Sequence, residues 1–225
     1  MSSAPPSEQP PRPSLPPLPG VRHIVAVASG KGGVGKSTTA ANLALALSQL
    51  GHRVGVLDAD IYGPSLAVLF GVDGKPQTED DKFMLPVERF GLQLMSIGFL
   101  VPPSQAMIWR GPMASQALDQ LLHQTRWKDL DVLIVDMPPG TGDIQLSLSQ
   151  RVPLTGAVIV TTPQEVAMAD VRREISFCQK AKVPILGFVE NMDLRYAEYE
   201  GATHSELAWA DRVGPMLEWL FPADA

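Results

Sequence analysis

The feature that most constrains this chain is a glycine-rich stretch at residues 29–38, SGKGGVGKST. Apolar residues 23–28 precede it and predict a short buried strand, and residues 38–50 predict a helix. A strand, a glycine loop and a helix in this order predict a loop that binds phosphate. The stretch fits the pattern G-x-x-x-x-G-K-[ST] at four fixed positions, Gly30, Gly35, Lys36 and Ser37.

Each residue type in this loop has a chemical reason. Glycines allow successive backbone N–H groups to turn toward phosphate oxygens, and the N-terminus of the following helix adds partial positive charge. We expect Lys36 to reach the β- and γ-phosphates of a nucleotide and the Ser37 hydroxyl to bind Mg²⁺. The predicted nucleotide site contains these two residues and the rest of the loop, namely Gly30, Lys31, Gly32, Gly33, Val34, Gly35 and Thr38.

Composition limits the class of protein. The chain has 225 residues, of which 45% are hydrophobic and 19% charged, and this suits one α/β domain. A net charge of −6 argues against a duplex-DNA binder. The single cysteine, Cys178, excludes an internal disulfide and a four-cysteine metal site within one chain. No apolar run approaches the roughly 20 residues that cross a bilayer. We therefore expect a cytoplasmic protein with no nucleic-acid or membrane partner.

The chain divides into three predicted regions. Residues 1–20 are proline-rich and predict a disordered leader, and residues 21–192 predict one domain. Residues 193–225 predict a divergent tail with seven acidic side chains against two arginines, and with one short apolar helix at 215–221. The leader and the tail both differ in composition from the domain between them.

Strands alternate with helices across the predicted domain. This alternation predicts a doubly wound, mostly parallel α/β sheet. Right-handed crossovers then place the loop after each strand at one edge of the sheet. Residues 71–91 are turn-rich. Further strands are predicted at 53–57, 91–99, 131–135, 156–161 and 185–189. Further helices are predicted at 113–124, from the end of the loop 137–143 to about residue 150, and at 165–181.

Acidic residues follow two of these strands. Asp136 ends the apolar strand 131–135, as a Walker B aspartate does, and we expect it to hold Mg²⁺ directly or through water. Asp58 and Asp60 end the strand at 53–57 and leave it on the same side. One of them would orient or deprotonate the attacking water and the other would support Mg²⁺ through water. We favour Asp60 for the water, and the alternative for Asp58 is that it only caps a turn.

Three further features belong to the same edge. The small-residue loop at 140–143 is predicted to sense the γ-phosphate. Asn191 ends a late strand, where its amide suits an adenine edge, although a plain turn residue is the alternative. Lys31 is a second lysine in the glycine loop. It either reaches a nucleotide in a partner subunit or is a solvated loop charge.

Several motifs in order resemble one known family. The glycine loop with Lys31 resembles the deviant Walker A motif of the MinD/ParA group of dimeric P-loop NTPases, which form a three-layer sandwich. Within that group, the chain resembles the Mrp/ApbC-type iron–sulfur cluster carriers over about residues 21–192. The motifs that carry this resemblance are VLDADIYGPS (56–65), MSIGFL (95–100), WRGP (109–112), VDMPPGTGD (135–143), TTPQEVAMADV (161–171) and VENM (189–192).

The resemblance implies an activity and partners. It implies a Mg²⁺-dependent ATPase that forms a homodimer, with Lys31 contacting the nucleotide across the interface. It implies that Lys36 and Ser37 serve phosphate and Mg²⁺, that Asp60 helps to position water, and that Asn191 contacts adenine. It also implies that the protein holds an iron–sulfur cluster and passes it to apo-proteins.

The chain departs from this family after residue 192. In the family a C-x-x-C pair follows VENM and bridges a cluster between two subunits, whereas residues 193–198 read DLRYAE. No cysteine follows Cys178, which we expect to be a buried structural thiol. We interpret the chain as a core without its front domain and its cluster-binding end, as a truncated or frame-shifted product would be. The alternative functions are a MinD/ParA-type regulatory or positioning ATPase and a truncated nucleotide-binding remnant.

Overall fold

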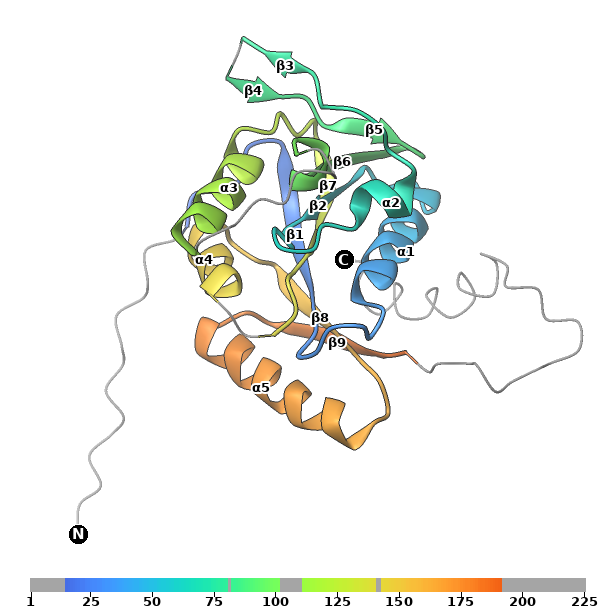
Figure 1. Ribbon diagram of the computed structural model, residues 1–225, viewed down its shortest axis with the longest axis vertical. Helices are drawn as coiled ribbons and strands as arrows, with labels where there is room; N and C mark the ends of the chain where they lie inside the picture. The colour runs from blue at the N-terminus through green and yellow to red at the C-terminus, as the bar shows by residue number, and fades with distance from the viewer. Residues whose placement is uncertain (1–14, 81, 102–110, 141–142, 192–225) are drawn as a thin grey trace, which may run out of the picture.

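The computed structural model describes residues 15–80, 82–101, 111–140 and 143–191 (Figure 1). The predicted tail at 193–225 and most of the predicted leader at 1–20 lie outside the described residues. The leader's last residues differ from the expectation, because Leu18 is buried in the core with 3% of its surface exposed. An apolar side chain between prolines can pack on the domain without joining a strand or helix.

Seven strands form one sheet in the order β5-β6-β2-β7-β1-β8-β9. Every neighbouring pair is parallel except β5 with β6, which is antiparallel. This result confirms the predicted mostly parallel α/β fold. The strand bounds are β1 Val21–Ala28, β2 Val54–Asp58, β5 Val87–Arg89, β6 Leu92–Ser96, β7 Leu130–Asp136, β8 Gly156–Thr161 and β9 Ile185–Glu190, and a separate antiparallel hairpin joins β3 Thr78–Glu79 to β4 Phe83–Met84.

Helices cover both faces of the sheet and produce three layers (Figure 1). Helix α1 packs on β1, β2 and β7, and α2 lies beside it, whereas α3 and α4 lie together on the other side. Strands β2 and β8 are fully buried, as expected for parallel strands that are covered on both faces. The helices are α1 Lys36–Gln49, α2 Leu66–Phe70, α3 Gly111–His123, α4 Asp143–Arg151 and α5 Glu165–Ala181, with a 3₁₀ helix, η1, at Ile97–Phe99.

One prediction for the stretch between β2 and α3 was wrong. The predicted strand at 91–99 ends at Ser96, because the Ser96 hydroxyl accepts a hydrogen bond from the Gly98 N–H at 3.0 Å and the chain turns into η1. The turn-rich stretch at 71–91 contains β5, which pairs with β6 through a tight turn. Phe90 and Gly91 have φ values of 52° and 75° in that turn.

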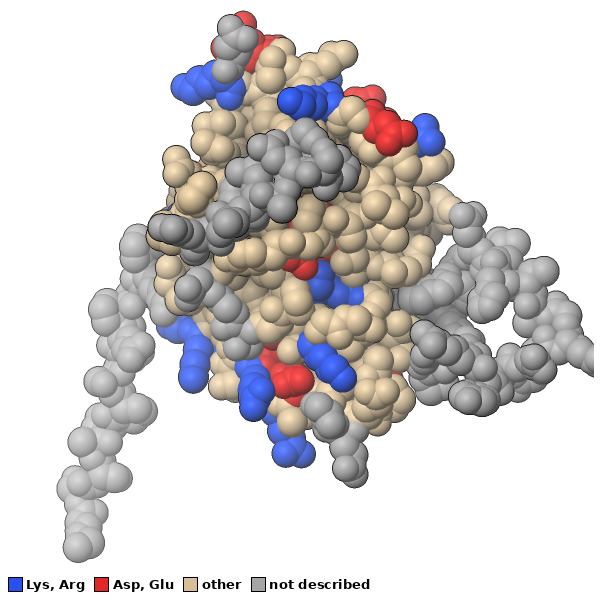
Figure 2. All heavy atoms as spheres, viewed as in Figure 1, with Lys and Arg blue, Asp and Glu red and all other residues tan. Residues whose placement is uncertain are grey.

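The charged surface is mixed on the face drawn in Figure 2, where Lys and Arg side chains lie in small groups beside acidic ones. No described helix is long and apolar enough to cross a bilayer.

Candidate functional site

The glycine loop lies between the end of β1 and the start of α1, as the sequence predicted. Gly33 and Gly35 have φ values of 79° and 84°, which side chains other than glycine rarely adopt. A Cβ atom at Gly35 would also overlap the amide of Asn191. Both positions therefore require glycine, and Gly35 requires it for two separate reasons.

Lys36 and Asp136 form a buried ion pair beneath this loop. The Lys36 ammonium contacts Asp136 Oδ1, and it lies 3.3 Å from the Ser37 hydroxyl. Lys36 is 7% exposed and Asp136 is fully buried. Burial raises the pKa of Asp136, although the Lys36 charge opposes that rise. The structure thus brings together three residues that the sequence predicted separately for phosphate and Mg²⁺.

The surroundings of the second Asp136 oxygen show whether these residues fit Mg²⁺. Asp136 Oδ2 is buried and has no hydrogen-bond partner among the described residues, and the Ser37 hydroxyl is close enough to interact with the same carboxylate. An unpartnered buried carboxylate oxygen is costly unless something binds it. Carboxylate and hydroxyl oxygens are the ligands that Mg²⁺ prefers, so these residues fit that ion.

Asp58 lies beside Asp136, because the two are register partners in β2 and β7. Its carboxylate accepts hydrogen bonds from four donors, which are the backbone N–H groups of Asp60 (3.1 Å), Ser65 (2.9 Å) and Leu66 (3.2 Å) and the hydroxyl of Ser96 (3.1 Å). Burial and the nearby Asp136 charge raise the pKa of Asp58 to about 6. Of the two interpretations from the sequence, this geometry favours Asp58 as the residue that caps and shapes the following loop.

Asp60 lies in that loop, and its carboxylate accepts a hydrogen bond from the Gly63 N–H at 3.1 Å. It is partly exposed and is close enough to contribute to the raised pKa of Asp136. Asp60 therefore has a carboxylate that reaches solvent at the same edge of the sheet as the glycine loop.

Asn191 contacts the loop backbone, and Lys31 belongs to the loop itself. The Asn191 side-chain amide donates a hydrogen bond to the Val34 carbonyl at 2.9 Å. The Asn191 backbone N–H donates to the Thr161 carbonyl at 2.7 Å. This contact ties the end of β9 to the glycine loop. Lys31 is exposed, as are Gly32 and Thr38.

The predicted sensing loop at 140–143 is only partly described. The Gly140 N–H donates a hydrogen bond to the Ser29 carbonyl at 2.8 Å, so this loop and the glycine loop are in direct contact. Residues 141 and 142 lie outside the described residues.

Sequence reasoning missed the buried polar groups of α4 and α5. Gln145 is fully buried and Glu174 is 1% exposed. Their positions in amphipathic helices gave no sign of this, because the helix period does not show which polar residue faces a neighbouring helix.

Cys178 is 2% exposed, which confirms the predicted buried thiol. Burial raises the pKa of this thiol to about 11. Among the described residues, no group of three His, Cys, Asp or Glu side chains could hold a metal ion.

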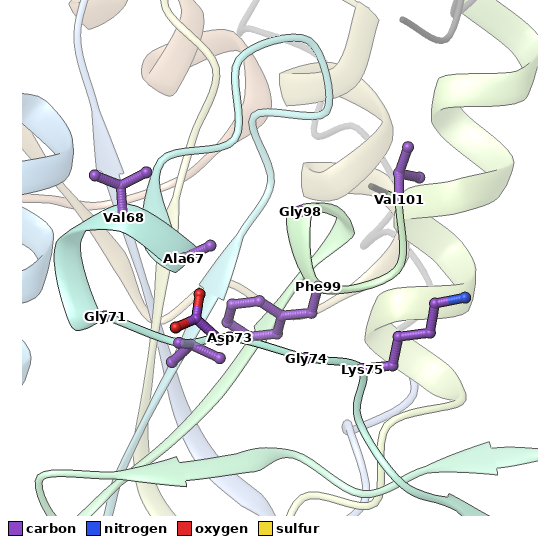
Figure 3. Close-up of a pocket in the computed structure, with 10 residues that line it drawn as sticks. Ala67, Val68, Gly71, Asp73, Gly74, Lys75, Gly98, Phe99 and Val101 are labelled. Carbon is purple, nitrogen blue, oxygen red and sulfur yellow. The ribbon is translucent and has the colours of Figure 1, made fainter. Parts of the chain in front are cut away.

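A separate pocket of about 440 Å³ opens near α2 and η1 (Figure 3). Phe99 and Ala67 supply apolar walls, and Asp73 and Lys75 lie on the chain segment that borders it. None of the predicted nucleotide-site residues lines this pocket.

Comparison with known proteins places these features in a family. A family model of the ParA group, described as NUBPL iron-transfer P-loop NTPase, matches residues 20–208. The chain is 57% identical over 177 residues to an iron–sulfur cluster carrier protein of Aquifex aeolicus, covering 78% of this chain and 49% of that protein. It is 54% identical over 205 residues to the carrier protein of Pseudomonas fragi, covering 90% and 71%. The chain thus spans about half the length of several relatives, including the Aquifex protein.

Solved structures agree with this fold. A nucleotide-binding protein from Archaeoglobus fulgidus, in complex with ADP, aligns with a TM-score of 0.66 and 41% identity over 77% of this chain and 68% of that one. The septum site-determining protein MinD from Pyrococcus horikoshii aligns with a TM-score of 0.54 over 85% and 76%, and at 24% identity this likeness shows the fold alone. The chain belongs to the ParA-type family of NUBPL iron-transfer P-loop NTPases.

Proposed function

We propose that this chain binds ATP with Mg²⁺, hydrolyses it, and serves the delivery of iron–sulfur clusters to apo-proteins. The observation that carries the ATPase part is the buried pair of Lys36 and Asp136, with an unpartnered Asp136 oxygen beside the Ser37 hydroxyl. The unpartnered oxygen would suit a cation, and the Lys36 ammonium lies at the loop that would hold the phosphates.

The residues at the glycine loop would bind the triphosphate. Lys36 would exchange part of its contact with Asp136 for β- and γ-phosphate oxygens, and the backbone N–H groups of residues 30–37 would donate to the same phosphates. Ser37 and Asp136 would hold Mg²⁺, which neutralises charge on those phosphates when it is bound. Asp60, partly exposed at the same edge, would orient or deprotonate the attacking water.

Lys31 and Asn191 would complete the nucleotide site. We propose that Lys31, exposed at the loop, contacts the nucleotide of a second copy of this chain in a homodimer. Asn191 would contact adenine, and its hydrogen bond to Val34 holds its amide beside the loop. A cytoplasmic location stays a prediction from the sequence.

The carrier role is supported by the names of the relatives rather than by cluster ligands in this chain. A cluster is the proposed cargo, and cysteine thiolates are its usual ligands. The only cysteine in the sequence is Cys178, which is buried and has a pKa raised to about 11. We therefore assign no residue of this chain to the cluster.

The ATPase proposal is tested with Lys36→Ala. We expect this variant to weaken ATP binding by at least about 100-fold, because it removes the only buried cation at the phosphate loop among the described residues. Titration with a fluorescent ATP analogue measures the affinity, and the exposed Lys75→Ala is the matched control. Normal ATP affinity in Lys36→Ala would refute the assignment of the loop.

The carrier proposal is tested by anaerobic reconstitution with iron and sulfide, followed by desalting and measurement of protein-bound iron. We expect the chain alone to retain no cluster, which would limit its part in delivery to the ATPase step. A stable cluster that disappears in Cys178→Ser would make Cys178 a ligand and contradict its assignment as an inert thiol. Activation of an apo [4Fe–4S] enzyme by a separate cluster donor, with and without this chain and ATP, tests delivery itself.

A further inference from the structure

Helix α5 contains a buried acid that the nucleotide site does not use. Glu174 is 1% exposed, and its Oε2 atom has no hydrogen-bond partner in the described parts of the chain. A buried carboxyl group destabilises a fold unless neighbouring groups compensate for its lost hydration. The groups around Glu174 therefore have to compensate for this cost.

The nearest polar neighbour is Gln145 in α4. Its side chain is fully buried, and its Nε2 atom donates a hydrogen bond to the Pro138 carbonyl at 3.1 Å. The Glu174 carboxyl lies close enough to the same amide for Gln145 to lower the pKa of that carboxyl. One buried amide thus joins α5 to the loop that begins directly after Asp136.

Helix α5 also contacts the glycine loop one turn before Glu174. A Cβ atom at Gly30 would lie 2.7 Å from the backbone carbonyl oxygen of Asp170, so these two backbones are in close contact. The Ser29 carbonyl of the glycine loop in turn accepts a hydrogen bond from the Gly140 N–H at 2.8 Å. One face of α5 therefore touches both loops of the nucleotide site, directly at Gly30 and through Gln145 at Pro138.

We propose that Glu174 and Gln145 form a buried strut that positions the Pro138 carbonyl, and with it the loop after Asp136, for nucleotide hydrolysis. This inference rests on the proposed ATPase function and assigns Glu174 as a positioning residue, because it does not reach the nucleotide site itself. Gln145 transmits the contact from α5 to the loop.

The hydrogen-bonding needs of the two side chains fit this role. Within the part of the chain that the structure describes, Gln145 Oε1 is buried without a donor and Glu174 Oε2 is buried without a partner. A protonated carboxyl group is a donor, so a neutral Glu174 supplies what the amide oxygen lacks. Burial raises the pKa of Glu174 to about 7, although the nearby Gln145 opposes that rise. A glutamine at position 174 would offer the same donor and acceptor without a charge.

The experiment compares Glu174→Leu, Glu174→Gln, Gln145→Leu and the double leucine variant, with the exposed Gln179→Leu of the same helix as control. We expect Glu174→Leu and Gln145→Leu each to lower kcat for ATP about tenfold with KM nearly unchanged, and the double variant to be no slower than either. Glu174→Gln should recover kcat to within about twofold of the unsubstituted chain. A second readout is the hydrogen-exchange rate of the Gly140 amide, which should rise in both leucine variants and return in Glu174→Gln.

The proposal would be overturned if the two leucine substitutions multiplied their effects on kcat in the double variant. It would also be overturned if the exchange rate of the Gly140 amide were unchanged in both single leucine variants. If the unsubstituted chain hydrolyses no ATP, the proposed function fails, but the exchange rates still decide whether the strut exists. If Glu174→Leu does not fold, Gln145→Leu and Glu174→Gln carry the same comparison. A loss in Glu174→Gln as large as in Glu174→Leu would assign the acid a charge-dependent role and contradict the proposal.

Discussion

Strands β2 and β7 end in the same residue at the same register, yet the two aspartates have different surroundings. Asp58 and Asp136 are partners in adjacent parallel strands, and both side chains are fully buried. Asp58 accepts four hydrogen bonds from the loop that follows it and from β6. Asp136 contacts Lys36 through one oxygen, whereas its other oxygen has no partner in the ranges that the structure describes.

The difference shows that burial and strand position do not determine what a carboxylate does. The hydrogen bonds of Asp58 come from the chain itself, so that end of the sheet is complete without a ligand. Asp136 keeps an acceptor that has no partner among the described residues and that a cation could satisfy. We infer that substitution of Asp58 is measured mainly in stability and substitution of Asp136 mainly in turnover.

The largest expected effect is on hydrolysis in Asp136→Asn. We expect turnover to fall about 100-fold, because the amide cannot replace a carboxylate as a Mg²⁺ ligand. The amide oxygen can still accept from Lys36 but carries no counter-charge, so we expect the melting temperature to fall as well, and turnover is measured at a temperature where the variant is folded. Steady-state ATP hydrolysis over a Mg²⁺ titration measures the effect, and turnover within threefold of the unsubstituted chain would contradict the role of Asp136.

The next largest expected effect is on the free energy of unfolding in Asp58→Ala. Removal of this carboxylate leaves the N–H groups of Asp60, Ser65 and Leu66 without their acceptor, and we expect a loss of about 3 kcal/mol in the free energy of unfolding. Urea denaturation measures it. Ser96→Ala, which removes one donor to Asp58 and the acceptor of a single N–H, that of Gly98, is the comparison and should lose less, about 1–2 kcal/mol.

The pH dependence of this loss has a definite sign. Because burial raises the pKa of Asp58 to about 6, the folded state binds the proton more tightly than the unfolded chain does. The contribution of Asp58 to stability is therefore full below about pH 4 and decreases as the pH rises toward about 6. Asp58→Ala should lose more stability at pH 4 than at pH 7, and the opposite order would mean that Asp58 stays charged.

The sequence alone could predict the end of β7 better than the end of β2. Asp136 follows an apolar strand and Lys36 lies in a fixed pattern, so both were assigned from neighbours within a few residues. The partners of Asp58 include Ser96, which reaches it because β6 lies beside β2 in the sheet. That neighbour relation is not local in the sequence, and no spacing rule predicted it.

The same limit explains the errors in secondary structure. The apolar run at 91–99 predicted one strand, but the Ser96 side chain begins η1 by accepting the Gly98 N–H. Helix α2 was missed because Leu66–Phe70 is only five residues long and its first N–H groups are held by Asp58 rather than by a residue at its own start. Long periodic segments such as α5, at Glu165–Ala181, agreed with the prediction at both ends.

A smaller effect on hydrolysis is expected from substitution of Asp60, which lies in the loop after Asp58. Asp60→Ala should slow hydrolysis about tenfold while ATP affinity stays within about threefold, because Asp60 is proposed to act on water rather than on nucleotide. Its carboxylate accepts only the Gly63 N–H among the described contacts, so stability should change less than in Asp58→Ala. Rapid-quench measurement of a single turnover tests this, and unchanged turnover would move the role elsewhere, with Asp143 as the next candidate.

The smallest expected effect lies at the opposite end of β7. Asp131 contacts Arg22 at 3.1 Å and Arg53 at 3.1 Å, and it also accepts the Arg53 backbone N–H at 2.9 Å. These contacts, those from Arg53 above all, lower the pKa of Asp131 to about 2. Asp131→Asn should lower the melting temperature at pH 7 by only about 2 °C, because both arginines are largely exposed and solvent screens the pairs.

The sign of the pH effect is opposite to that of Asp58. A carboxyl whose pKa is lowered stabilises the fold above its ordinary pKa of about 4, and that stabilisation is lost as the pH falls toward about 2. The difference in melting temperature between Asp131→Asn and the unsubstituted chain should therefore shrink in acid, and 1 M salt should shrink it at pH 7. ATP turnover should be unchanged, since Asp131 starts the strand that Asp136 ends. A turnover defect in Asp131→Asn would mean that β7 transmits changes along its length, and turnover in Asp136→Asn would then no longer report on the Mg²⁺ site alone.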